Sequence, residues 1–306
     1  MAEETMSRPI SKRLAVITGA NKGIGLEISR QLASNRIMVI LTARDEKNGL
    51  EAVAKLKESG ISDVVFHQLD VKDSISIASL ADFIKTQFGK LDILVNNAGV
   101  SGVIVDCEAL RALKLGAGEV VGEKSELVKG VMQQTYEKAE ECLKTNYYGC
   151  KAVIEALLPL LQLSSSARIV NVSSNMGQLK FISNPRAREY LDGVDVPTEE
   201  KVEEVLQWFL KDFKEDLLGP NGWPTMLSAY SVSKAALNAY TRILAKKYPG
   251  FCINCVNPGF VKTDINCNTG ILTVEDGAKA PVMLALLPDS GPSGLFFDQM
   301  ELSTFA

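Results

Sequence analysis

The chain has few of the features that mark a membrane, secreted or nucleic-acid-binding protein. Across 306 residues, no apolar stretch approaches the roughly 20 residues that a membrane-spanning helix needs. The first residues, MAEETMSRPISKR, are polar and lack the apolar segment of a secretion signal. Lys and Arg (33) are outnumbered by Asp and Glu (37), so the net charge of −4 offers no basic surface for nucleic acid or anionic lipid. We therefore expect a cytoplasmic protein with neither kind of partner.

Cysteine and histidine are also scarce. Six cysteines do not make a disulfide scaffold in a chain of this length, and His67 is the only histidine. Cys252 and Cys255 form a CxxC, which raises the possibility of a metal or thiol-redox site. However, FCINCV is apolar, no second CxxC exists, and His67 lies in the apolar run VVFHQL. We interpret both runs as buried strands and predict no metal site.

Apolar runs of strand length alternate with amphipathic segments of helix length. The expected strands are RLAVITG, IMVILTA, DVVFHQLDV, LDILVNNAG, ARIVNVSS, FCINCVNPG and GLFFD. Helices are expected at about 24–34, 47–58, 76–88 and 136–163, and around Tyr230. Continuous Val, Ile and Leu strands separated by helices indicate an α/β fold with a parallel sheet covered on both faces. We predict a doubly wound (Rossmann) sheet of seven strands, in a single domain over residues 1–306.

Two segments are longer than the usual loops between such elements. They span residues 100–135 and about 178–227, and both follow the carboxyl ends of strands, where ligands bind in open α/β sheets. We expect them to shape a substrate pocket; surface decoration is the alternative. The second is an insertion that contains TEEKVEEVLQWFLKDFKEDLL, whose apolar stripe predicts a helix over 198–218.

The glycine-rich segment TGANKGIG, from Thr18 to Gly25, follows the first strand and opens the first helix. In such a segment Gly19 permits a tight turn, Gly23 lets the backbone approach a pyrophosphate, and Gly25 permits close packing of the helix. An ordinary glycine turn is the alternative. The strand before and the helix after favour a dinucleotide-binding loop.

The end of the second strand, LTARDE, bears on which dinucleotide binds. An acid at this point grips the ribose hydroxyl of NAD, whereas an arginine suits the 2′-phosphate of NADP. Arg44 precedes Asp45 here, and Lys22 adds a second cation from the glycine-rich segment. Two cations beside one acid favour NADPH over NADH; the alternative is that either cation is simply solvated.

Tyr230 and Lys234 lie four residues apart in AYSVSKAALNAYTRIL, a stretch with helical apolar spacing. Residues at this spacing share one helical face. A nearby cation favours the ionised phenol, so we expect Lys234 to lower the pKa of Tyr230. Such a phenol can donate a proton to a forming alkoxide. A chance surface pair is the alternative.

Together with NNAG (96–99), NVSSNMG (171–177) and NPG (257–259), these motifs resemble the short-chain dehydrogenase/reductase family, in the family's order and over nearly the whole chain. More narrowly, FHQLDV, LADFIKTQFGKLDILVNNAGV, NGWP and GPSGLFFDQMELSTF resemble the family's plant branch of monomeric carbonyl reductases. The resemblance implies a catalytic set of Asn146, Ser174, Tyr230 and Lys234. It also implies cofactor contacts by Thr18, Gly19, Asn21, Lys22, Gly23, Ile24, Gly25, Arg44, Asp70, Val71, Asn97, Ala98, Gly99, Tyr230, Lys234, Pro258, Gly259, Val261 and Thr263.

The chain departs from compact members of the family in the separation of Ser174 and Tyr230, which are 56 positions apart. We expect the helix over 198–218 to cover the surface that pairs subunits in oligomeric members, which would leave a monomer. The alternative is that this helix packs elsewhere.

Apolar candidates for the substrate pocket are Val103, Val105, Met226, Phe260 and Ile265, although each could equally be core. Asp106 could receive a substrate amine or be an ordinary exposed loop residue. We predict NADPH-dependent reduction of a hydrophobic cyclic ketone, of terpenoid or alkaloid type, to a secondary alcohol, with Tyr230 as the proton donor. The alternatives are an NADP+-dependent dehydrogenase acting on a terpenoid alcohol and a non-catalytic dinucleotide-binding scaffold or sensor.

Overall fold

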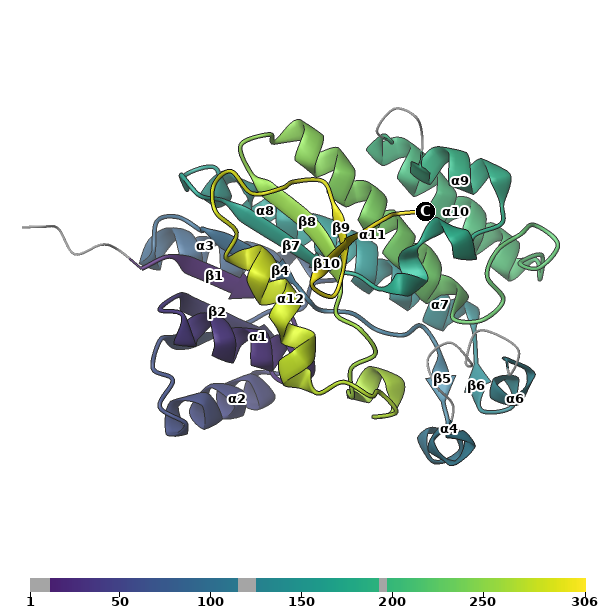
Figure 1. The fold of residues 1–306 in the computed structure, drawn as a ribbon, viewed down its shortest axis with the longest axis horizontal. Helices are drawn as coiled ribbons and strands as arrows, with labels where there is room; N and C mark the ends of the chain where they lie inside the picture. The colour runs from purple at the N-terminus through teal and green to yellow at the C-terminus, as the bar shows by residue number, and fades with distance from the viewer. Residues whose placement is uncertain (1–11, 115–124, 193–196) are drawn as a thin grey trace, which may run out of the picture.

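The computed structural model describes residues 12–114, 125–192 and 197–306, in which strands and helices alternate along the chain (Figure 1). The strands are β1 (Leu14–Ile17), β2 (Met38–Ala43), β3 (Val64–Gln68), β4 (Ile93–Asn96), β5 (Ile104–Val105), β6 (Met132–Gln133), β7 (Arg168–Val172), β8 (Cys252–Asn257), β9 (Phe296–Asp298) and β10 (Glu301–Ser303). The α-helices are α1 (Gly23–Ser34), α2 (Glu46–Glu58), α3 (Ser74–Gln87), α4 (Cys107–Leu113), α6 (Ser125–Lys129), α7 (Tyr136–Leu143), α8 (Cys150–Leu161), α9 (Pro185–Asp192), α10 (Glu199–Lys214), α11 (Ser228–Lys247) and α12 (Val274–Ala285). Single turns are η1 (Lys144–Gly149, π-helical) and the 3₁₀ turns η2 (Asn175–Gly177), η3 (Leu179–Phe181) and η4 (Asp264–Asn266).

The central sheet has the strand order β10-β9-β8-β7-β4-β1-β2-β3. Every pairing in it is parallel except that of β10 with β9, and β5 pairs with β6 in a separate antiparallel ribbon. The predicted doubly wound sheet is confirmed, and its seven predicted strands are the parallel ones. The count of seven omits β10, whose three residues ELS are partly or fully exposed and show no apolar run.

Helices cover both faces of this sheet because the strands alternate their apolar side chains between two cores. Val16, Ile40 and Leu94 lie in the core beneath α3, α8 and α11. Their neighbours Ile17, Leu41 and Val95 lie in the core beneath α1, α2 and α12. The chain winds in opposite directions from β1, with β2 on one side and β4 on the other. Ligands bind at such a switch point, outside the carboxyl ends of the strands.

The predicted long helix over 136–163 is interrupted. It consists of α7, the π-helical turn η1 and α8, and π-turns of this kind are common at functional sites. The predicted helix over 198–218 is confirmed as α10, which packs on α11 and α7. Lys151 of α8 ties α10 down through ion pairs with Glu203 at 2.6 Å and Glu199 at 3.0 Å.

A disulfide that the sequence analysis did not identify joins Cys107 to Cys267, which are 160 positions apart. It connects the start of α4 to the segment that follows β8. Cys252 and Cys255 are buried free thiols in β8, as expected of a core strand. Of the predicted loop 100–135, residues 115–124 lie outside the described residues, as do 193–196 of the insertion and 1–11 of the polar N-terminus. Among the described helices, none combines the length and apolar character needed to cross a bilayer.

Candidate active site

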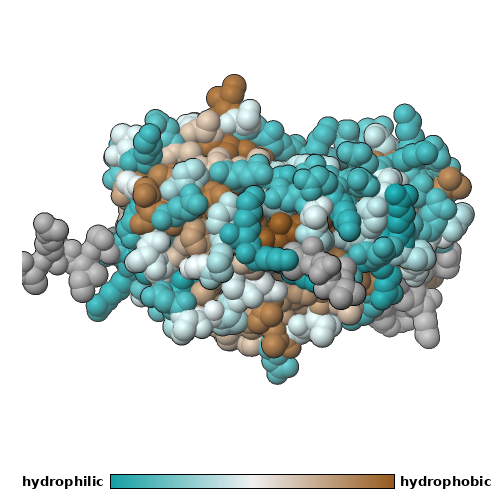
Figure 2. Space-filling model, turned by 90° about the horizontal axis from the view of Figure 1, so that it is seen from above, coloured by the Kyte–Doolittle hydropathy of each residue, from teal (hydrophilic) through white to brown (hydrophobic). Residues whose placement is uncertain are grey.

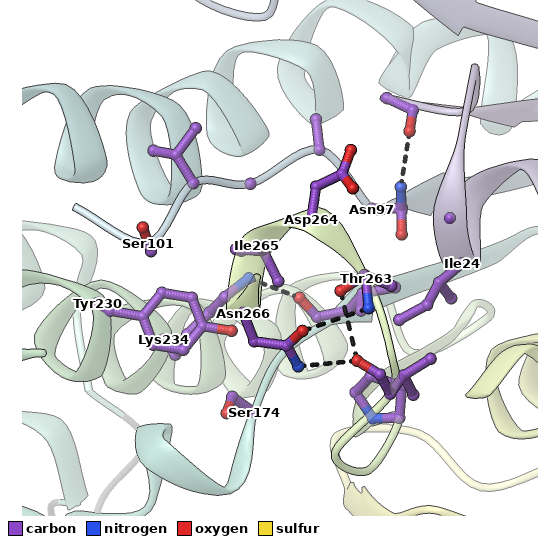
Figure 3. A pocket seen from close by; sticks show the side chains of 18 of the residues that line it. Ile24, Asn97, Ser101, Ser174, Tyr230, Lys234, Thr263, Asp264, Ile265 and Asn266 are labelled. Atoms are coloured by element: carbon purple, nitrogen blue, oxygen red, sulfur yellow. Dashed lines mark hydrogen bonds between the residues drawn. The ribbon is translucent and has the colours of Figure 1, made fainter. Parts of the chain in front are cut away.

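A pocket of about 1000 Å³ opens at the carboxyl ends of the central strands. The glycine-rich segment and the ends of β2 and β3 form one side of it, and Ser174, Tyr230 and Lys234 lie along another. The segment that follows β8 faces both, and Figure 3 shows Asn266 of this segment between Tyr230 and Thr263. Except for Thr18, Asp45, Asp106, Asn146 and Met226, every candidate cofactor, substrate or catalytic residue named from the sequence lines this pocket.

The glycine-rich segment approaches its neighbours too closely for side chains. Gly19 has a φ of +62°, and a Cβ there would lie 2.9 Å from the Ala98 Cα. A Cβ on Gly25 would lie 2.7 Å from the Gly19 carbonyl oxygen and would also clash with the Asn97 amide. The bare backbone at the start of α1 therefore borders the pocket, as a pyrophosphate requires. These residues fit a dinucleotide.

Thr18 and Asn97 join the ends of β1 and β4 beneath this cradle. The Thr18 hydroxyl accepts hydrogen bonds from the backbone N–H groups of Asn97 and Ala98, both at 3.0 Å. The Asn97 amide nitrogen donates to the carbonyl oxygens of Thr18 and Gly19, each at 3.0 Å. Thr18 is buried behind the pocket wall and supports the loop.

The charged residues at one end of the cradle have different partners. The Asp45 carboxylate accepts a hydrogen bond from the Asn48 backbone at 2.8 Å and so caps α2. Arg44 is exposed at the pocket. Lys22, the second predicted cation, pairs with Asp264 at 2.7 Å, which links the glycine-rich segment to the segment after β8.

Helix α11 places Tyr230 and Lys234 on the same side of the pocket (Figure 3). The Lys234 ammonium is buried, donates to the Val172 carbonyl oxygen at 2.8 Å and lies 5.6 Å from the centre of the Tyr230 ring. A Cβ placed on Gly99 would lie 3.6 Å from this ammonium, so the turn after β4 also borders it.

The prediction that the pKa of Tyr230 is lowered is wrong. Burial raises the pKa of Tyr230 to about 12, and a hydrogen bond with Ser174 opposes that rise only in part. Burial likewise lowers the pKa of Lys234 to about 8. The Lys234 ammonium lies closer to the Val172 carbonyl oxygen than to the centre of the Tyr230 ring. Desolvation of Tyr230 and Lys234 outweighs the electrostatic attraction between them that the four-residue spacing suggested.

Ser174 follows β7 and is half-buried at the pocket. Its hydroxyl oxygen accepts a hydrogen bond from the Met176 backbone at 3.2 Å and caps η2. The hydroxyl can therefore still donate its proton toward the pocket. Ser174 and Tyr230 together present two hydroxyl groups to one region.

Asn146 does not line the pocket but lies behind it, in the turn η1. Its amide oxygen accepts a hydrogen bond from the Val100 backbone N–H at 2.9 Å, and its amide nitrogen donates to the Val100 carbonyl oxygen at 3.0 Å. A Cβ placed on Gly99 would lie 3.3 Å from the Asn146 amide oxygen. Asn146 and Lys234 therefore approach the same point of the chain.

The candidate substrate region has apolar walls. The predicted residues that line it are Val103, Val105, Phe260 and Ile265. Met226 was also predicted to line it, but it packs beside the pocket against Leu110, Val128 and Cys267. Sequence reasoning missed Leu110, Met132, Phe181, Leu227, Asn266 and Cys267, which also line the pocket. Leu227 adjoins Met226, and no periodic pattern indicated which of the two faces inward. Asp106 is exposed and caps α4 by accepting from Glu108 and Ala109, so its carboxylate is already engaged.

We expect Lys234→Met to stabilise the fold at pH 7. The folded-state pKa of Lys234 is about 8 against an ordinary 10.5, so below pH 8 folding must bury a charged ammonium at a cost of roughly 3 kcal/mol. Losing the donor to Val172 costs about 1–2 kcal/mol, which leaves a net gain of about 1–2 kcal/mol. Because the unfolded chain binds more protons than the folded chain between pH 8 and 10.5, wild-type stability rises over this range and the advantage of Lys234→Met should vanish.

Denaturant unfolding of the wild type and Lys234→Met at pH 7 and 10.5 measures this difference in stability, with exposed Lys246→Met as control. A pH-independent difference would contradict it.

The family model for short chain dehydrogenases matches residues 13–186, more than half of the chain. The chain belongs to the short-chain dehydrogenase/reductase family. It is 59% identical to "Short-chain dehydrogenase/reductase 1" of Saponaria officinalis over 305 residues, covering 99% of both chains. It is 56% identical to "(+)-neomenthol dehydrogenase" of Arabidopsis thaliana over 309 residues, covering all of both.

Among solved structures, that of salutaridine reductase from Papaver somniferum superposes with a TM-score of 0.88 at 56% identity, covering 94% of this chain and 99% of that one. The predicted resemblance to the plant carbonyl reductase branch is confirmed, and the chain is an oxidoreductase. The family binds a nicotinamide dinucleotide, and the glycine cradle described above fits that group.

Proposed function

We propose that this protein reduces a hydrophobic cyclic ketone to a secondary alcohol with NADPH, and that Tyr230 donates the proton. The observation that carries the proposal is a single pocket that holds the glycine cradle, the hydroxyl groups of Ser174 and Tyr230, and apolar walls. A bound nicotinamide supplies the hydride.

The chain's own residues orient the ketone and supply the proton. Ser174 donates a hydrogen bond to the carbonyl oxygen and holds it beside the Tyr230 hydroxyl. Because the pKa of Tyr230 is about 12, the phenol is protonated at neutral pH and can donate as negative charge develops on that oxygen. Lys234 then stabilises the phenolate by its charge until the phenolate is reprotonated from solvent, and Asn146 holds the turn that borders Lys234. Lys234 would also hold the ribose hydroxyls of a bound cofactor.

NADPH is the proposed cofactor because of the side chains at the end of β2. Arg44 is exposed at the pocket, where a 2′-phosphate would need a cation. The neighbouring acid, Asp45, caps α2 and is therefore less able to grip a ribose hydroxyl.

The proposed substrate is of terpenoid or alkaloid type. Two relatives are named for salutaridine and neomenthol, and the walls contributed by Val103, Val105 and Phe260 suit a bulky apolar ring. The alternative is NADP+-dependent oxidation of a terpenoid alcohol, which the word dehydrogenase in a relative's name favours. The same groups would then act in reverse, with the phenolate accepting the proton.

The test is consumption of NADPH by the purified protein with a panel of monoterpenoid and alkaloid ketones. NADH, and the corresponding alcohols with NADP+, are run in parallel. Turnover of a cyclic ketone with NADPH well above NADH supports the proposal. Turnover of the alcohols alone would favour the dehydrogenase. Tight NADPH binding without any turnover would favour a scaffold or sensor.

We also propose that residues 1–306 form one domain that is monomeric. Helix α10 covers α11, with Val205 and Phe209 fully buried against the core. The face seen in Figure 2 is mainly hydrophilic, with hydrophobic residues in separate groups rather than one continuous patch. Sedimentation equilibrium should give a mass near 33.2 kDa, and twice that mass would overturn the proposal.

A further inference from the structure

Ser233 lies in α11 between Tyr230 and Lys234, and its side chain is fully buried. Its hydroxyl donates a hydrogen bond to the Tyr230 carbonyl oxygen at 2.7 Å. A hydroxyl has only one proton, so the lone pairs of Ser233 are left to accept. They accept from the Asn146 amide nitrogen at 3.0 Å. One side chain thus connects the helix that carries Tyr230 and Lys234 to the turn that carries Asn146.

The other contacts of the Asn146 amide show what Ser233 adds. Asn146 makes a two-way contact with the Val100 backbone, which uses its oxygen and one amide N–H. The second N–H faces Ser233 and the sulfur of Cys142, 3.2 Å away. Burial raises the pKa of Cys142 to about 12, so the sulfur is a neutral thiol and a weak acceptor. Ser233 is therefore the only oxygen acceptor for that N–H among the residues that the structure describes.

We propose that Ser233 is a positioning residue for the reduction, which fixes Asn146 against the first turn of α11. The inference rests on the proposed function, because Ser233 does not line the pocket and would act on the reduction only through Asn146. Its neighbour two positions earlier provides a matched comparison. Ser231 is also fully buried in α11, but its hydroxyl has no hydrogen-bond partner within the described part of the chain.

The experiment compares Ser233→Ala with Ser231→Ala. We expect Ser233→Ala to lower kcat about tenfold, with KM for the ketone and Kd for NADPH changed less than twofold, whereas Ser231→Ala leaves all three unchanged. Ser233→Cys keeps the volume but hydrogen-bonds weakly, so it should resemble Ser233→Ala even if the alanine variant folds poorly. In an Asn146→Ala background, adding Ser233→Ala should cause no further loss of kcat.

A second readout does not depend on catalysis. Hydrogen exchange of the Val100 amide should accelerate in Ser233→Ala and not in Ser231→Ala, because that N–H is held by Asn146. Equal kcat in the two alanine variants, additive losses with Asn146→Ala, or unchanged exchange at Val100 would each overturn the inference. If the wild type reduced no ketone, the proposed function would fail, and the exchange comparison would still decide whether Ser233 positions Asn146.

Discussion

Tyr230→Phe is expected to lower kcat for ketone reduction by about 10²–10⁴-fold, the range typical of losing a positioned proton donor. The substitution removes only the hydroxyl, which is hydrogen-bonded with Ser174. The ring remains, so its packing and the position of Lys234 beside it should change little. Binding of NADPH should be nearly unaffected. Steady-state rates with the best ketone, together with a fluorescence titration of NADPH, separate these two effects.

The matched control is Tyr147→Phe. Tyr147 is a fully buried tyrosine one residue after Asn146, and its hydroxyl has no hydrogen-bond partner in the described structure. The same atom is therefore removed from a site where it makes no bond, and kcat should stay within about twofold. If Tyr230→Phe retained wild-type kcat, another group would have to be the donor. The family assignment would stand, but the mechanism proposed for this pocket would not.

The fold and the general position of the site could be predicted because their signals are local. The glycine-rich segment carries its strand and helix on either side, and the four-residue spacing of Tyr230 and Lys234 alone places both on one face. The number of predicted strands matched the seven parallel strands, because each of these strands contains a run of apolar residues. The exposed strand β10 has no such run, and it was missed.

The errors concern properties that depend on contacts distant in sequence. Whether Met226 or Leu227 faces the pocket depends on how the chain enters α11, where Leu227 takes a left-handed φ of +48°. The direction of the Tyr230 pKa shift depends on how deeply the surrounding fold buries the phenol, which helical spacing does not indicate. Composition argued against a disulfide scaffold, but one disulfide requires only that two cysteines meet, and Cys107 and Cys267 are 160 positions apart.

That disulfide leads to the second large expected effect. Replacing both Cys107 and Cys267 by serine should lower the free energy of unfolding by about 2–4 kcal/mol, because the bond restricts a loop of 160 positions in the unfolded chain. A purely entropic model gives roughly 5 kcal/mol for a loop of this length, which serves as an upper limit. Urea unfolding under non-reducing conditions measures the loss. Reductant should lower wild-type stability by a similar amount and leave the double variant unchanged.

The location of the bond makes it more than a stabilising link. Cys267 lines the pocket, and α4, which begins at Cys107, contributes Leu110 to the same wall. Asp264, three residues before Cys267, is ion-paired with Lys22 of the glycine-rich segment. Breaking the disulfide should therefore also loosen the apolar wall and raise KM for the ketone, while Kd for NADPH changes little. Cys252→Ser, at a buried free thiol remote from the pocket, is the control and should show neither effect. Six titratable thiols in the denatured, unreduced protein would mean that the bond does not form, and both expectations would fail together.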